Sequence, residues 1–212
     1  MLEWQSIIYF IARWIIIIPL LSGVRSLKKL NNSFLAIFLW MACMFLIQNY
    51  SSWQFDNKVN NLASLHLMIF LDVGFCGFFF HSILKKAWFK LFVKISCAAL
   101  LLLIAYNAFF IQTISENPNI IRSLGGYFMM LWSFIYLYEL LKAEETINLF
   151  ESPEFIAAIA ILLYFGTTQV IHLLDIYVPR QLKEIRLLIR ITGHSIMIVY
   201  YFLIGIALWK KK

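Results

Sequence analysis

The stretch that decides the fold is LFVKISCAALLLLIAYNAFFIQ, residues 91–112, in which Lys94 is the single charged side chain. A helix needs about 20 mainly apolar residues to cross the hydrocarbon core of a bilayer, at about 1.5 Å of rise for each residue. The run is continuous rather than alternating, and it is far longer than the roughly 10 residues of a membrane β-strand. We therefore predict that residues 91–112 form a transmembrane helix.

Six further stretches have the same length and apolar character. We predict these spans at about residues 4–24, 33–50, 62–83, 119–141, 153–174 and 187–209. Within them, only Pro19 interrupts a span. The sequence thus predicts an all-α fold, a polytopic bundle of seven transmembrane helices that makes up a single transmembrane domain over residues 1–212.

The composition agrees with this fold class. Apolar residues make up 62% of the chain and charged residues 14%, and the mean hydropathy is +0.81. A water-soluble domain is nearer to 45–50% apolar and about 25% charged, so these numbers exclude one. The three cysteines, Cys43, Cys76 and Cys97, all fall inside predicted spans, where they are not placed to form a loop disulfide.

The basic residues near the span ends predict an orientation. The first, third and fifth loops and the tail hold ten lysines and arginines, whereas the segments on the other side hold five. Because basic residues are retained on the cytoplasmic side, we expect the N-terminus outside and the C-terminus inside, in the inner (plasma) membrane. The net charge of +7 then indicates topology and contact with membrane lipids, and not nucleic-acid binding.

Polar residues of the last two spans carry the predicted site. On the last span Arg186, Arg190 and His194 recur every four residues, so they share one helical face. The preceding span carries a second polar face near the same end, and neighbouring spans with a short loop can bring two such faces together. We predict an outward-facing ligand pocket lined by Arg190, His194, His172, Asp175 and Gln169. The alternative is hydrogen bonding between helices, with Arg186 and Arg190 extending to the interface.

Two charged residues lie near the middle of other spans. Arg13 in the first span and Asp72 in the third have matching depths from the outer side. A buried ion pair between them would remove two uncompensated charges from hydrocarbon. This pair can be a structural clamp or part of a ligand or proton site, and the remaining alternative is an Arg13 that extends to the interface.

The loop LLKAEETINLFESPEF, residues 140–155, is an acidic island on a predicted basic face. Its carboxylates suit a basic partner through charge complementarity, and we predict docking residues Glu144, Glu145 and Glu151. The alternative is a solvated linker. In either case Ser152 and Pro153 predict the cap and first turn of the sixth span.

The four histidines raise the question of a metal or a haem. His66 and His81 share one span, but the sixth and seventh spans carry one histidine each, so the set that a two-haem cytochrome uses is half complete. Ile198 stands where the second histidine of a zinc-hydrolase pair on the last span would be. We therefore predict no cofactor and no metal site.

The C-terminal third has a recognisable pattern. It contains Pro153-Glu154-Phe155, then ILLYFG at 161–166, and a last span that closes in Ala207-Leu208-Trp209 and lysines. This segment resembles small seven-span inner-membrane proteins of Bacteroidetes-type bacteria. The resemblance implies a signalling neighbourhood with a partner of the histidine kinase type, and it transfers no functional residue.

Together these features predict a non-enzymatic sensory or accessory signalling protein of the membrane. A small transporter or channel that uses the same polar layer is the alternative. An intramembrane haem or metal enzyme is the third possibility, and it requires a convergent cluster of His, Asp and Glu side chains.

Overall fold

The computed structural model describes residues 3–143, 148–179 and 181–211 and, of residues 3–6, 172, 173 and 175–177, the backbone alone. Within these ranges every regular element is a helix, as the sequence predicts. The α-helices are α1 (Glu3–Trp14), α2 (Ile17–Ser26), α3 (Asn32–Asp56), α4 (Leu62–Ile83), α5 (Ala87–Phe110), α6 (Asn119–Leu141), α7 (Pro153–Tyr177) and α8 (Lys183–Lys210), with 3₁₀ turns η1 (Leu27–Lys29) and η2 (Leu149–Glu151).

Seven segments among the described residues are long and apolar enough to cross a membrane, which confirms the predicted number. The chain is therefore a multi-pass membrane protein. Two helices extend beyond the predicted apolar spans. Helix α3 continues from the predicted end at Tyr50 to Asp56, and α8 begins at Lys183 instead of Leu187. Hydropathy marks where lipid ends, whereas a helix can continue into the polar interface because its backbone hydrogen bonds are internal.

The first span is broken in the middle, between α1 and α2. Pro19 lacks an N–H, and in a regular helix its ring would clash with the carbonyl group of Ile15. The chain avoids this clash because the Ile18 N–H donates to the Ile15 carbonyl over 3.0 Å, a tighter turn than that of an α-helix. The predicted interruption at Pro19 is thus a break between two helices.

Two helix starts follow from their capping residues. Ser152 Oγ accepts a hydrogen bond from the Phe155 N–H, and Pro153 occupies the first turn of α7, as predicted. Asn31 Oδ1 accepts from the Phe34 N–H at the start of α3. Both caps satisfy N–H groups that have no partner inside the helix.

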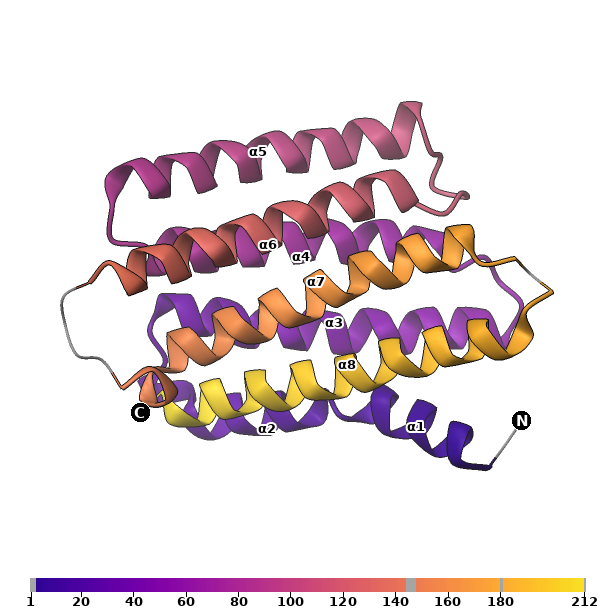
Figure 1. Cartoon of the computed structure of the whole chain (residues 1–212), viewed down its shortest axis with the longest axis horizontal. Coiled ribbons are helices and arrows are strands. Elements are labelled where there is room, and N and C mark those ends of the chain that lie inside the picture. The colour runs from indigo at the N-terminus through magenta and orange to yellow at the C-terminus, as the bar shows by residue number, and fades with distance from the viewer. Residues whose placement is uncertain (1–2, 144–147, 180, 212) are drawn as a thin grey trace. The chain divides into compact units, whose positions relative to one another are not determined.

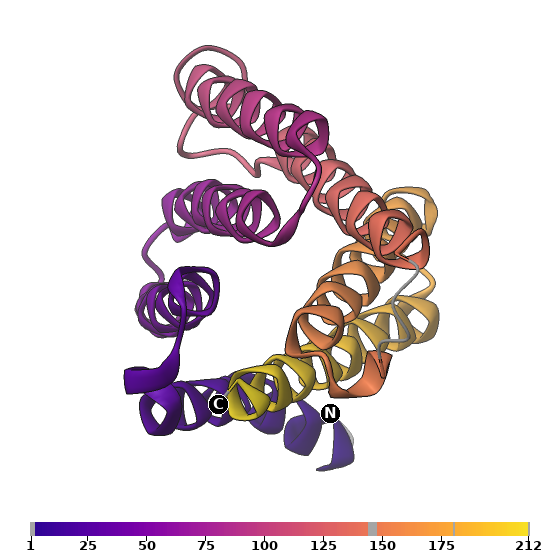
Figure 2. The same cartoon turned by 90° about the vertical axis from the view of Figure 1, so that its left-hand side faces the viewer.

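The backbone contacts divide the chain into two compact units. Unit 1 is Met1–Lys29 with Glu145–Lys212 and contains α1, α2, α7 and α8, whereas unit 2 is Leu30–Glu144 and contains α3 to α6. In unit 1, α8 is the central helix, because α7 packs against it and α1 and α2 follow each other along it (Figure 1). In unit 2, α4 is central and lies between α3 and α5, with α6 also against it (Figure 2). The single transmembrane domain stays a prediction.

Unit 2 joins its helices through buried polar side chains. The Trp132 Nε1–H donates to Ser96 Oγ over 3.0 Å between α6 and α5, and Ser64 Oγ–H donates to Gln54 Oε1 over 2.8 Å between α4 and α3. Glu139, near the end of α6, is buried, and its carboxylate accepts the backbone N–H groups of Lys85 and Lys86 over 2.7 and 2.6 Å. These bonds satisfy polar groups that would be costly in an apolar environment.

Each unit has an end at which lysines and arginines follow the helix termini. In unit 2 it is the end at which α3 and α5 begin and α4 and α6 finish, and it carries His81, Lys85, Lys86, Lys90, Lys94 and Lys142. In unit 1 it is the end with Arg25, Lys210 and Lys211, where the Arg25 guanidinium lies 3.8 Å from the centre of the Trp209 ring. We call these the basic ends of the two units.

Candidate functional site

A basic face of α8 forms the centre of the candidate site. Lys183, Arg186, Leu187 and Arg190 recur at helical spacing and line a depression of about 300 Å³ at the end of unit 1 away from its basic end. The Arg190 side chain is exposed. The structure therefore confirms that Arg186 and Arg190 share one face, and it adds Lys183, which the sequence analysis did not include.

His194 lies one turn further along α8, and its ring is held from two sides. Its Nδ1 lies 2.7 Å from the carbonyl oxygen of Arg190. Since a carbonyl oxygen can only accept, Nδ1 carries the proton, which leaves Nε2 of the neutral ring as an acceptor. The Tyr9 ring of α1 meets the His194 ring edge-on, with 4.4 Å between the ring centres.

Tyr9 is the residue of this cluster that sequence reasoning missed. It sits in the apolar run IIYFIA, and its one charged neighbour at helical spacing, Arg13, does not point to His194, so no local pattern marks the contact. Its contact with His194 depends on α1 packing along α8. That packing brings together residues nearly the whole chain apart, which composition and periodicity do not report.

On α7 the predicted residues divide into described and undescribed side chains. Gln169 is 4% exposed and is therefore buried. Thr168 uses its hydroxyl group locally, because its Oγ1–H donates to the Tyr164 carbonyl oxygen over 2.5 Å. His172 and Asp175 lie on α7, but their side chains are outside the described part of the chain, so their place in the pocket stays a prediction.

Asp72 has a hydrogen-bond partner that the sequence did not predict. Its Oδ1 accepts from the Trp40 Nε1–H over 2.9 Å, which ties α4 to α3 near the middle of both helices. Arg122 of α6 also attracts the Asp72 carboxylate electrostatically. Arg13 is exposed in unit 1, with its guanidinium 5.7 Å from the centre of the Trp14 ring. Because Arg13 and Asp72 belong to different units, their ion pair stays a prediction.

The acidic loop is described in part. Glu144 and Glu145 lie outside the described residues, and Glu151 is exposed at the end of η2. Glu154 is engaged by the end of α8, since Lys211 Nζ lies 2.5 Å from its Oε1. Lys210 Nζ also donates to the Phe150 carbonyl oxygen over 2.6 Å. The loop is thus fastened to the basic end of unit 1.

No three His, Cys, Asp or Glu side chains gather in metal-binding geometry within the part of the chain that the structure describes. His66 is buried near the start of α4, and its Nε2 lies 3.2 Å from the Glu116 carbonyl oxygen. His81 is half-buried in the last turn of the same helix.

The chain was compared with protein-family models, with curated proteins and with solved structures, and no match was found in any of the three. The resemblance to Bacteroidetes-type membrane proteins therefore stays a prediction.

Proposed function

We propose that this protein is a non-enzymatic sensory or accessory membrane protein that responds to an anionic ligand at the basic face of α8. The observation that carries the proposal is the depression lined by Lys183, Arg186 and Arg190, with His194 held one turn below it. Ionisable side chains within a membrane span are costly, and they commonly mark functional sites.

The chemistry of this face favours a carboxylate or a phosphate. Arginine binds both groups through two parallel hydrogen bonds, and the exposed Arg190 side chain is available for such a contact. Lys183 adds a third positive charge at the rim. Anions are thus the ligand class whose charge complements the depression.

The break in the first span offers a route for the response. Helices α8 and α2 pack very closely at Gly205, because a Cβ atom there would lie 2.8 Å from Ile18 Cγ2. Beyond the break, α1 reaches the site through the Tyr9–His194 contact. A ligand that moves His194 would therefore tilt α1 about the Pro19 break while α2 stays seated, which is a hinge motion.

The basic end of unit 1 is where a partner would receive the signal. There Lys211 and Lys210 fasten the end of α8 to the acidic loop, whose Glu151 is exposed. We propose that a movement of α8 repositions this loop against a basic partner, with a histidine kinase as the partner type. This scheme includes the inner membrane and an inside C-terminus, and its support is the excess of basic residues on the first, third and fifth loops and the tail.

The experiment measures thermal unfolding of the purified full chain in detergent, with inorganic phosphate or succinate added at constant ionic strength. We expect both anions to stabilise the wild type through binding to the folded state, and we expect Arg190→Ala and His194→Ala to lose this shift. Lys28→Ala is the matched control, since it removes an exposed charge from unit 1 far from the site along the chain.

Two results would overturn the proposal. One is an equal shift in the wild type and both site variants, which would make the effect a general salt effect. The other is the absence of any shift with either anion in the wild type.

A transporter is the second candidate function, and Asp72 is the observation that favours it. This carboxyl group lies halfway along α4, where ionisable residues often belong to ion or proton pathways. The test is a flux assay in proteoliposomes, with Asp72→Asn as the variant that preserves size and the acceptor oxygen. Anion flux that is lost in Asp72→Asn would replace the sensory function with transport.

A further inference from the structure

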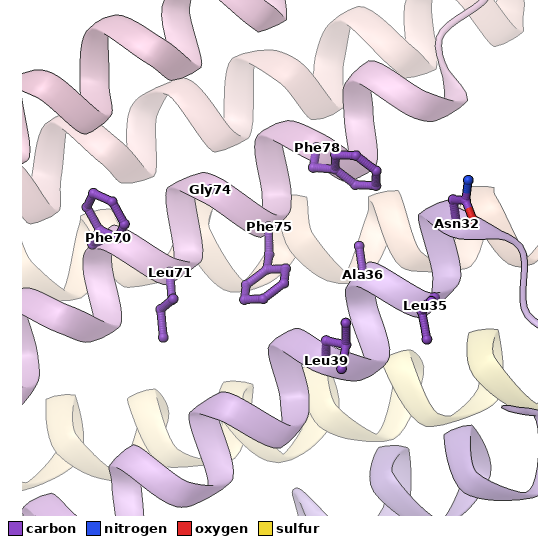
Figure 3. Close-up of a pocket in the computed structure, with 9 residues that line it drawn as sticks. All are labelled: Asn32, Leu35, Ala36, Leu39, Phe70, Leu71, Gly74, Phe75 and Phe78. Carbon is purple, nitrogen blue, oxygen red and sulfur yellow. The ribbon is translucent and has the colours of Figure 1, made fainter.

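Two apolar grooves flank the central helix of unit 2. The first lies between α3 and α4 and has a volume of about 530 Å³. Figure 3 shows its walls, with Leu35, Ala36 and Leu39 on α3 and with Leu71, Phe75 and Phe78 on α4. Asn32, at the start of α3, is the polar residue of this lining. The groove is thus apolar along its length and polar at the basic end of unit 2.

The second groove lies between α4 and α5 and has a volume of about 380 Å³. Away from the basic end, this groove is lined by Gly74, Gly77, Ala98 and Leu101, and Cys97 lies on its wall. Toward the basic end it is lined by His81 and Lys94. This groove therefore repeats the pattern of the first, with an apolar channel that leads to polar and basic groups.

The two grooves share residues of α4. Gly74 and Phe78 line both, so the grooves run side by side over one helix. A Cβ atom at Gly74 would meet only Leu101 Cδ2, at 4.0 Å, so the space over this residue is open. Gly77 differs, because a Cβ atom there would lie 2.5 Å from Cys97 Sγ. Gly77 is needed for the close contact of α4 with α5, whereas Gly74 leaves room for a bound ligand.

Lys94 supplies a positive charge, which a ligand of these grooves must complement with a negative one. It lies two turns inside α5, and its side chain is exposed. Within the described part of the chain, no hydrogen bond or ion pair holds its ammonium group. Among the described residues of this end, the acid Glu139 is buried and already accepts two backbone N–H groups. An ammonium group at such a depth extends toward the interface, where it meets lipid headgroups.

We propose that this surface binds one anionic diacyl phospholipid astride α4. One acyl chain lies in each groove, and the phosphate lies at the basic end against Lys94 and His81, with the Asn32 amide beside it. Two parallel channels joined at a common ridge match two chains on one glycerol backbone, and the basic groups at the shared end match an anionic phosphate. The inference rests on unit 2 alone and does not depend on the proposed sensory function.

The test is native mass spectrometry of the full chain released from detergent, with phosphatidylglycerol, phosphatidylcholine or glycerol 3-phosphate added. We expect one tightly retained phosphatidylglycerol, weaker retention of phosphatidylcholine, and no retention of the soluble phosphate, because its acyl chains are missing. Lys94→Gln should weaken phosphatidylglycerol binding roughly five-fold, the factor for one basic residue at an anionic membrane surface, and leave phosphatidylcholine unchanged.

Gly74→Leu tests the grooves separately from the charge. Its side chain would fill the space common to both channels, so we expect loss of both phospholipids. Gly74→Ala serves if the larger variant unfolds, since the open space accepts one methyl group and retention should fall by a smaller factor. Lys142→Gln is the matched control at the same basic end, because Lys142 is exposed and lines neither groove.

The proposal fails if phosphatidylglycerol and phosphatidylcholine are retained equally, because the basic end would then make no selection. It also fails if Lys142→Gln weakens binding as much as Lys94→Gln, which indicates a diffuse surface charge. Retention of two independent lipids, or of glycerol 3-phosphate by itself, would contradict the single diacyl ligand.

Discussion

The hydrogen-bonded polar side chains of unit 2 and the basic face of α8 in unit 1 differ in their environment. In unit 2 Trp40 and Trp132 donate to the side chains of Asp72 and Ser96 on neighbouring helices, and the buried Glu139 accepts from the backbone of Lys85 and Lys86. In unit 1 the face of α8 with Arg190 stays exposed around a depression. Polar groups that hold helices together and polar groups that remain accessible are thus different residues of one membrane protein, and substitutions should separate stability from binding.

The largest expected effect on stability is at Glu139. Replacement by leucine removes the acceptor of two backbone N–H groups, those of Lys85 and Lys86, at a buried site. Each unsatisfied group costs about 1–3 kcal/mol, so we expect a loss of about 3 kcal/mol in the free energy of unfolding. Glu139→Gln keeps one acceptor oxygen and should lose about half as much. Thermal or denaturant unfolding in detergent measures both, and equal stability of Glu139→Leu and wild type would show that solvent replaces the carboxylate.

Trp40→Phe comes next, with an expected loss of about 2 kcal/mol. The variant removes the donor to the Asp72 carboxyl group, and hydrogen bonds to charged groups contribute about 1.5–3 kcal/mol. Trp40→Phe combined with Asp72→Leu should recover part of this loss, because no polar group then lacks a partner. A double-mutant cycle by unfolding measures the coupling, and additive losses would contradict a direct interaction.

Gly77→Ala should destabilise unit 2 by about 1 kcal/mol. The added Cβ atom would lie 2.5 Å from Cys97 Sγ, and overpacking costs about 1–3 kcal/mol, partly offset by about 1 kcal/mol from the better helix propensity of alanine. Gly74→Ala is the matched control one turn away, and it should be neutral or slightly stabilising because the space there is open. An equal change in the free energy of unfolding for both variants would mean that helix propensity alone accounts for it, without overpacking at Gly77.

Arg190→Ala should have the smallest effect on stability, within about 0.5 kcal/mol, because exposed side chains contribute little to folding. Its expected effect on the anion response is by contrast complete. Thermal unfolding measured without ligand and with phosphate separates the effect on stability from the effect on the anion response. A loss of stability as large as that of Glu139→Leu would place Arg190 among the groups that hold the fold.

Local patterns predicted the elements but not their partners. The seven spans, the Ser152 cap and the interruption at Pro19 all depend on residues within a few positions of each other, and the structure has each of them. The basic face of α8 was also predicted, since a spacing of four residues is a local property. The Tyr9–His194 contact was not predicted, because it joins opposite ends of the chain.

Asp72 shows where sequence reasoning stops. Its cost in hydrocarbon made a partner necessary, and matched depth suggested Arg13. The structure provides Trp40, which also lies near mid-span, on the adjacent antiparallel helix α3. Depth could have marked Trp40 as well, but whether its side chain reaches Asp72 depends on which helices are neighbours and on how each is rotated, and the Arg13–Asp72 ion pair stays a prediction.

The sequence by itself determined that this chain lies in a membrane, because about 20 apolar residues in a row allow one solution, a helix whose backbone bonds are internal. Tertiary structure alone decided that α4 and α8 are central, that Trp40 of α3 bonds Asp72 of α4, and that two grooves meet over Gly74. The physical reason is that lipid selects helices by composition, whereas helices select one another by shape and hydrogen bonding, which local composition does not encode.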